Sequence, residues 1–218
     1  MPFGYTGNFP NQQVKNSGIF SPEDLLNLSS VGEYGGSLEL IESQTVSGVT
    51  AVNFTNIQGE RYRVMKMDIN DVTPDTDATN TYWGLRFSSD GGSSYRNTAD
   101  YSYAFWYGGA GASSTLGAVG YQNATELRIG TFTSDTGSYI STNSTIHIAN
   151  CHDSALGTFA VFNGVSFGQT TIGYSYMGMG SSQHAESINA ISLFGTHSIA
   201  FSGQVNLYGF LEIWVFKD

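Results

Sequence analysis

The feature that most constrains the fold is a succession of short runs rich in β-branched and aromatic residues, each bounded by Gly, Asn, Ser or Asp. The runs recur at a spacing of roughly 10 to 20 residues with no helical pattern between them, which is typical of antiparallel sheets. We therefore expect an all-β protein, an antiparallel β-sandwich of a jelly-roll-like kind. The predicted strands cover residues 37–46, 50–54, 60–69, 81–88, 101–107, 125–132, 144–150, 158–167, 170–177, 187–194 and 204–216.

The composition narrows the classes of function. The 218 residues are enough for one well-buried core, and charged residues make up only 12% of them, against about 25% in soluble proteins. A net charge of −10 with 8 Lys and Arg argues against nucleic-acid binding, because phosphates must be met by basic side chains. No apolar run reaches the length of a membrane span, so we expect no membrane insertion.

The N-terminal region, residues 1–36, differs from the rest of the chain. Its first 18 residues are Gly, Asn, Gln and Pro with isolated aromatics, a pattern that builds no core and is typical of an extended arm. Ser21 and Pro22 then suit the start of a short helix over residues 20–28. We expect this arm to anchor the chain to neighbouring proteins, with residues 37–218 forming the sandwich. The candidate anchors are Phe3, Tyr5, Phe9 and Phe20.

Two of the predicted strands carry informative patterns. In residues 60–69 the apolar phase changes, and a β-bulge near Val64 and Met65 would absorb the slip. The last strand is apolar on both faces, so it is either central under a covering layer or lies at a subunit boundary. The second interpretation predicts a homo-oligomer, with a trimer as one form. Its candidate interface is Tyr208, Phe210, Trp214 and Phe216.

Two glycine-rich stretches are predicted to be connections. The tract GGAGASSTLGAVG, residues 108–120, is interpreted as a long loop. The sequence SSDGGSSYR, residues 88–96, contains Asp90 followed by two glycines. A phosphate cradle would need a helix start or a lysine after the glycines, and neither follows. We therefore interpret Asp90 to Gly92 as a hairpin turn between the strands at 81–88 and 101–107.

Few residue groups suggest chemistry. The carboxylates of DINDVTPDTD, which begins at Asp68, are a calcium candidate with Asp71, Asp75 and Asp77 as ligands. They lack the spacing of a known calcium loop, and solvated loop aspartates are the alternative. His147, Cys151 and His152 are out of phase for a zinc site, and a small buried cysteine explains the pattern better. The glutamates are scattered, so the sequence predicts no enzyme and no cofactor.

Aromatic side chains on two strands suggest a carbohydrate surface. Tyr82, Trp83 and Trp106 could stack on sugar rings, because aromatic faces with polar rims suit carbohydrate. Core packing is the alternative for aromatics on strands. The sequence alone leaves both interpretations open.

Four stretches combine into a pattern that spans most of the chain. They are NSGIFSPEDLLNLSSVGEYGGSLELIESQTVSG, AVNFTNIQGERYRVMKMDIN, RFSSDGGSSY and SGQVNLYGFLEIW. This pattern resembles virion structural proteins of tailed bacteriophages, especially of marine and cyanobacterial phages. By position, residues 90–95 correspond to the turn of that group, and Val205, Leu207, Tyr208 and Gly209 to its closing strand. The resemblance implies a β-sandwich module of tail fibres, appendages or particle-surface proteins, with no catalytic residues.

Taken together, the sequence predicts a non-enzymatic structural component of a tailed-phage virion, assembled in the host cytoplasm. The favoured placement is a tail fibre or appendage subunit that joins other virion proteins through its arm and contacts the host, including a host-surface glycan. A capsid decoration (cement) protein is the first alternative. A lectin-like carbohydrate-binding module and a glycan-cleaving enzyme are the others.

Overall fold

The computed structural model describes residues 38–59, 61–75, 78–110, 115–134, 141–167 and 173–211. The chain divides into two units, Met1–Ser37 and Leu38–Asp218, and the described residues all belong to the second. The predicted arm and helix, with the anchors Phe3, Tyr5, Phe9 and Phe20, lie outside them. So do Asp77, Trp214 and Phe216.

The described part of the chain is built from strands, which confirms the predicted all-β class. One 3-10 turn, η1 (Thr196–Ser198), precedes the last strand. The strands are β1 (Leu38–Val49), β2 (Ala51–Phe54), β3 (Tyr62–Pro74), β4 (Ala78–Ser88), β5 (Tyr101–Ala110), β6 (Thr115–Ala124), β7 (Leu127–Ser134), β8 (Ser141–Ala149), β9 (Gly157–Phe167), β10 (Gly173–Ala185), β11 (Ala190–Gly195) and β12 (Phe201–Leu211).

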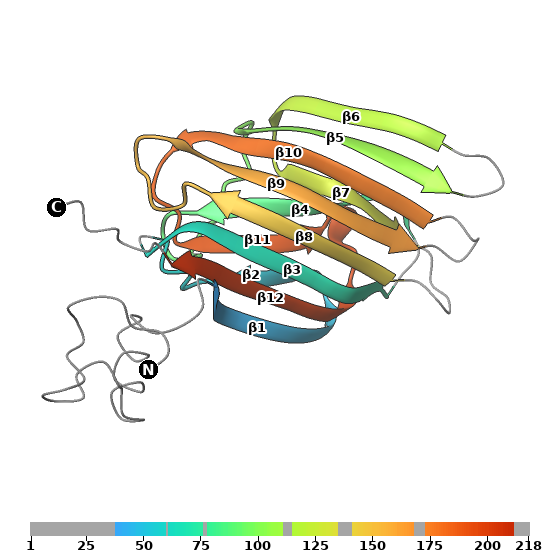
Figure 1. Cartoon of the computed structure of the whole chain (residues 1–218), viewed down its shortest axis with the longest axis horizontal. Helices are drawn as coiled ribbons and strands as arrows, with labels where there is room; N and C mark the ends of the chain where they lie inside the picture. The colour runs from blue at the N-terminus through green and yellow to red at the C-terminus, as the bar shows by residue number, and fades with distance from the viewer. Residues whose placement is uncertain are drawn as a thin grey trace, which may run out of the picture. The chain divides into compact units, whose positions relative to one another are not determined.

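The strands form two antiparallel sheets that pack as a sandwich. The larger sheet has the order β1-β12-β3-β8-β9-β10-β5-β6, and the smaller has the order β2-β11-β4-β7. Figure 1 shows the larger sheet in front, from β6 at the top to β1 at the bottom, with the smaller sheet behind it. One face of the larger sheet therefore covers the core, and its other face, the outer face, turns away from the smaller sheet.

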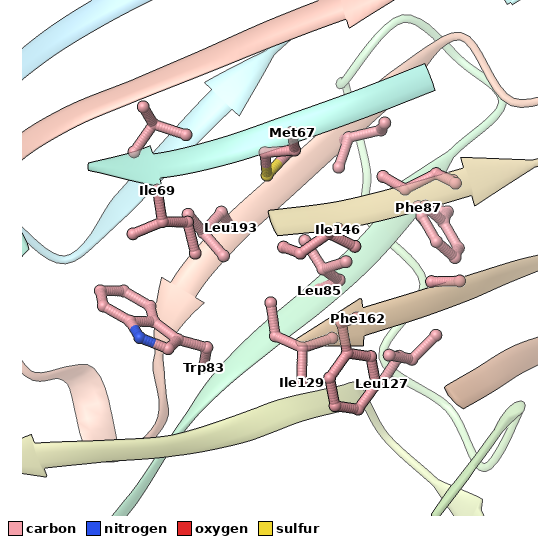
Figure 2. Packing of buried hydrophobic residues seen from close by; sticks show 14 of the residues in the cluster. Met67, Ile69, Trp83, Leu85, Phe87, Leu127, Ile129, Ile146, Phe162 and Leu193 are labelled. Atoms are coloured by element: carbon pink, nitrogen blue, oxygen red, sulfur yellow. The ribbon is translucent and has the colours of Figure 1, made fainter. Parts of the chain in front are cut away.

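The core lies between the two sheets because side chains alternate along each strand, so every second residue points inward. Each fully buried large apolar side chain contributes roughly 1.5 to 3 kcal/mol to stability. The labelled side chains in Figure 2 are all buried and come from both layers: Met67, Ile69, Ile146 and Phe162 from the larger sheet, and Trp83, Leu85, Phe87, Leu127, Ile129 and Leu193 from the smaller.

Strand β3 contains the phase change that the sequence predicts. Tyr62 is buried, Arg63 and Val64 are not, and inward-facing residues resume at Met65. The register against β12 slips at this point, where Phe210 pairs with Val64 but Leu211 pairs with Tyr62. The irregularity thus lies beside the predicted bulge position. It lets β3 point side chains of both phases into the same core.

The prediction of a loop over residues 108–120 is wrong. β5 continues to Ala110, and β6 begins at Thr115 and pairs with β5 as the edge of the larger sheet. Gly and Ala have low strand propensity, which hides this strand in the sequence. The strand is stabilised by its pairing with β5 and not by its intrinsic propensity. The ring of Tyr107 lies where a Cβ at Gly117 would be, so the two strands fit closely.

The Asp90 segment is a turn, but it does not make a hairpin between β4 and β5. The two strands belong to different sheets, so the segment carries the chain from one layer to the other. Gly91 and Gly92 have φ values of 75° and 84°, a left-handed conformation that favours glycine. The chain first folds back on β4, where the Arg96 amide donates a hydrogen bond to the Phe87 carbonyl at 3.0 Å.

The Asp90 carboxylate organises this turn. It accepts hydrogen bonds from the Ser88 hydroxyl at 2.6 Å and from the Ser94 amide at 2.9 Å. These hydrogen bonds hold the pKa of Asp90 well below its usual range, and the bond from Ser88 has the largest effect. All of its recorded partners belong to the turn itself, which assigns the segment a structural role.

Candidate functional site

The outer face of the larger sheet carries an unusual number of exposed apolar side chains. The β5–β10 register places Trp106 opposite Met177, and the β10–β9 register places Met179 opposite Val161. Trp106, Met177 and Met179 are 58%, 62% and 58% exposed. We call the exposed apolar side chains with the outward phase on β9, β10, β5 and β6 the apolar patch; it consists of Trp106, Leu116, Phe159, Val161, Val165, Phe167, Met177 and Met179.

An open hollow of about 990 Å³ adjoins the apolar patch, and its lining also includes the polar residues Ser102, Gln122 and Ser181. Ala104 on β5 pairs with Gly120 on β6, and both residues line the hollow. Their small size leaves the space open. Phe159, Val161 and Met179 also line it. A Cβ added at Gly120 would have its nearest neighbours at 3.8 and 3.9 Å, so the space above this residue is open.

Charged residues avoid this end of the sheet. The sequences of β9, β10, β5 and β6 contain no Asp, Glu, Lys or Arg. Across the sheet from β9, the first strand with charged side chains on the outer face is β3, where Lys66 and Asp68 form an ion pair at 2.7 Å. At the end of the sheet, Asp100 precedes β5 and accepts a hydrogen bond from His184 of β10 at 2.8 Å. In a chain with a net charge of −10, four adjacent uncharged strands define a surface with little electrostatic cost of association.

The predicted subunit interface lies on the same outer face but further along the sheet. Tyr208 and Phe210 project from β12, where both are half-buried. The Lys66 ammonium lies 5.6 Å from the centre of the Tyr208 ring, and the His147 and Phe210 rings stack with centroids 6.2 Å apart. These two aromatics are partly engaged within the chain, whereas the apolar patch is more exposed.

The three aromatics proposed as a glycan platform do not share a surface. Trp83 is completely buried and packs edge-on against Phe201 at 5.0 Å, so it cannot stack on a sugar. Tyr82 is half-buried, 6.1 Å from Phe105, with the Arg128 guanidinium over its ring. Only Trp106 among the three presents an exposed ring, and it belongs to the apolar patch.

The described residues provide no metal centre. Among them no group of three or more His, Cys, Asp or Glu side chains could hold a metal ion. Asp75 accepts a hydrogen bond from Ser202 at 2.9 Å, and Asp71 is exposed in a left-handed conformation with φ of 49°. Asp77, the third calcium candidate, lies outside the described residues.

Cys151 and His147, which the sequence places close together, lie in different environments. Cys151 is buried and reduced, and burial raises the pKa of its thiol to about 12. His147 points to the outer face and stacks on Phe210. A thiolate nucleophile needs a low pKa and access to solvent, and Cys151 has neither.

A second, polar hollow of about 460 Å³ lies against the smaller sheet, and sequence reasoning missed it. It is lined by Arg86, Glu126 and Arg128, among others. Glu126 binds the Arg128 Nε at 3.0 Å and lies 3.5 Å from an Arg86 nitrogen. Burial raises the pKa of Glu126, but hydrogen bonds from Thr125 and Arg128 outweigh it, so the pKa lies below its ordinary value. The carboxylate is thus held as a charged partner of two arginines.

Comparisons of the chain with models of known protein families, with curated proteins and with solved structures gave no match in any of the three. Among the described residues, no helix is long and apolar enough to cross a membrane. The described residues form an all-β sandwich with an exposed apolar face, and β9, β10, β5 and β6 in that face carry no Asp, Glu, Lys or Arg.

Proposed function

We propose that this chain is a non-enzymatic structural subunit of a tailed-phage virion, in a tail fibre or appendage, and that it assembles through the outer face of its larger sheet. The observation that carries the proposal is the apolar patch. Soluble monomers rarely expose contiguous apolar surface of this kind, and larger patches mark sites of association. The resemblance of residues 86–95 and 202–214 to virion proteins supports the particle as the place of assembly.

The chemistry of the described residues favours a structural role over catalysis. Glu186 is paired with Arg96, with Oε2 and Nη2 2.6 Å apart, and Glu39 is paired with Arg61 at 2.9 Å. Paired carboxylates hold charge in place and leave little capacity for the acid and base roles of glycan hydrolysis, which need one carboxyl group with a raised pKa.

A lectin-like module is the second candidate, and the exposed ring of Trp106 is the observation in its favour. Sugar sites combine an aromatic face with polar groups that bind the hydroxyls. The neighbours of Trp106 across the sheet are Met177 and Ala118. Apolar neighbours on both sides favour burial against protein over stacking on a sugar.

The test is the location and copy number of the chain in purified particles of the phage that encodes it. Quantitative mass spectrometry should find the chain at a fixed stoichiometry, in the small copy number of a tail component. Hundreds of copies per particle would favour the decoration protein instead. Absence from purified particles, or shortening of a polysaccharide by the purified chain, would contradict the proposal. Glycan-array binding that is lost in Trp106→Ala would favour the lectin.

A further inference from the structure

The area of the apolar patch is close to what one partner contributes to a stable interface. Seven of its side chains, all except Leu116, are between 39% and 62% exposed. With roughly 200 Å² for a large side chain, these fractions leave on the order of 700 Å² of apolar surface. A specific interface buries about 800 Å² per partner, whereas the largest patch on a typical monomer covers about 300 to 600 Å².

The absence of charge favours a second copy of the same chain as the partner. Two copies that each carry a net charge of −10 repel one another over most of their surfaces. Repulsion is smallest where neither copy carries a charge, which is over β9, β10, β5 and β6. A basic or acidic partner protein would have no charge to complement there.

The patch also has the shape that self-pairing needs, since a projecting residue stands beside a recess. Trp106 projects from β5, and Ala104 in the hollow lies two residues away on the same strand, a separation of about 7 Å. A two-fold axis can lie parallel to the face, run perpendicular to β5 and pass between Trp106 and Ala104. Such an axis places Trp106 of each copy over Ala104 and Gly120 of the other. Such an isologous contact closes as a dimer.

The same axis pairs the charges of β3 favourably. Lys66 belongs to the row of residues that runs across the sheet through His147, Val161, Met179 and Ala104, and Asp68 belongs to the neighbouring row through Met177 and Trp106. The axis exchanges these two rows. Lys66 of one copy is thereby brought toward Asp68 of the other, and the reverse contact forms by symmetry.

We propose that two copies of this chain pair face to face through the apolar patch, with Trp106 of each entering the hollow of the other. This inference rests on the proposed role as an assembling structural subunit and names its partner. The two larger sheets then stack about 10 Å apart, the usual separation of packed sheets. The proposed interface therefore lies closer to the β6 edge of the sheet than the interface that the sequence predicts on the last strand.

The experiment measures the mass of the full chain in solution by light scattering and sedimentation over a range of concentrations. The expected mass is about 47 kDa, twice that of the 23.5 kDa chain. Met179→Glu should raise the dissociation constant by at least about 100-fold, because the dimer would bury an unpaired carboxylate in each copy. Trp106→Ala should also weaken the dimer, and circular dichroism checks that both variants fold.

Leu156→Glu is the matched control. Leu156 is 54% exposed, close to the exposure of Met179, but it lies in the turn between β8 and β9, outside the apolar patch. It should leave the dimer intact. A monomer at every concentration, a trimer, a dimer that survives Met179→Glu, or equal dissociation by Leu156→Glu would each overturn the inference.

Oxidation by hydrogen peroxide gives an independent readout, since it converts accessible methionines to sulfoxides. Met177 and Met179 should be protected at high protein concentration and oxidised on dilution, while the buried Met65 and Met67 stay protected throughout. Rapid oxidation of Met177 and Met179 at all concentrations would contradict pairing through this face. A chain that dimerises but is absent from particles refutes only the proposed function; a particle component that is monomeric in solution refutes only the pairing.

Discussion

Replacement of Gly178 by alanine tests how closely β10 and β5 approach on the core side of the larger sheet. Gly178 pairs with Phe105. A Cβ at Gly178 would lie 2.5 Å from the Ala104 carbonyl oxygen and 2.7 Å from the Phe105 Cα. Both are backbone atoms, so no change of side-chain rotamer can relieve the contact. The strands themselves would have to move apart.

The change in stability that Gly178→Ala causes is best compared with the change at a second glycine in the same sheet. A Cβ at Gly108 on β5 would meet its nearest atoms, Leu116 Cδ2 and Ser175 Oγ, at 3.4 and 3.6 Å, an ordinary contact. Gly108→Ala should therefore stabilise the fold by up to about 0.5 to 1 kcal/mol, through the lower entropy of the unfolded chain. Gly178→Ala has the same gain, but overpacking costs about 1 to 3 kcal/mol. The two variants should differ by about 1 to 3 kcal/mol.

Urea unfolding, followed by tryptophan fluorescence at one low protein concentration, gives the free energy of unfolding of each variant. The slope against denaturant should be unchanged, so the difference should appear as a shift of the midpoint. If Gly178→Ala is as stable as Gly108→Ala, the close approach of β10 and β5 is refuted. If this slope falls only in Gly178→Ala, the variant has instead changed the compactness of its folded or its unfolded state.

Two further predictions follow from the buried thiol and from one ion pair. The Cys151 thiol, buried with a pKa of about 12, should react with a disulfide reagent only when the chain unfolds; rapid labelling in native buffer would contradict its burial. Hydrogen bonds from Arg96 hold the pKa of Glu186 below its ordinary value. This contribution to stability is present above about pH 4.5 and is lost as the pH falls through the folded pKa. Arg96→Gln should therefore lose less stability than the parent chain on acidification; an unchanged slope would show that the pair is ineffective.

The strands were predictable where alternation and β propensity agreed, and the failures have local causes. β6 was missed because its Gly and Ala residues have weak propensity and its stability comes from pairing with β5. The Asp90 turn was predictable from its glycines. That it joins two sheets was not, because the assignment of β4 and β5 to separate layers depends on their partners β11 and β10, which lie about 100 and 70 residues further along the chain.

The candidate site was only partly predictable, because a strand pattern shows which residues share a face but not always which face is inside. In β4, Trp83 shares its phase with Leu85 and Phe87, and this signal could have placed it in the core. In β5 the phase of Tyr101, Tyr103 and Phe105 is the more aromatic one, so the pattern places Trp106 on the opposite face, but it does not show whether another layer covers that face. The calcium candidates Asp71 and Asp75 illustrate the same limit, since proximity along a strand does not orient side chains toward a common point.

The distribution of charge is the signal that sequence reasoning could have used. Residues 101–124 and 154–185 contain no Asp, Glu, Lys or Arg, although the chain has 26 such residues in all, 18 acidic and 8 basic. Burial in the core explains one phase of an uncharged strand, but the opposite phase of a solvated strand normally carries charge. Here the outward phase is apolar or neutral on all four strands, and the topology makes those strands neighbours. Two uncharged stretches that are separate in sequence but adjacent in one sheet are best explained if that face is covered in the assembled protein, because a solvated face would have no reason to exclude charge on every strand.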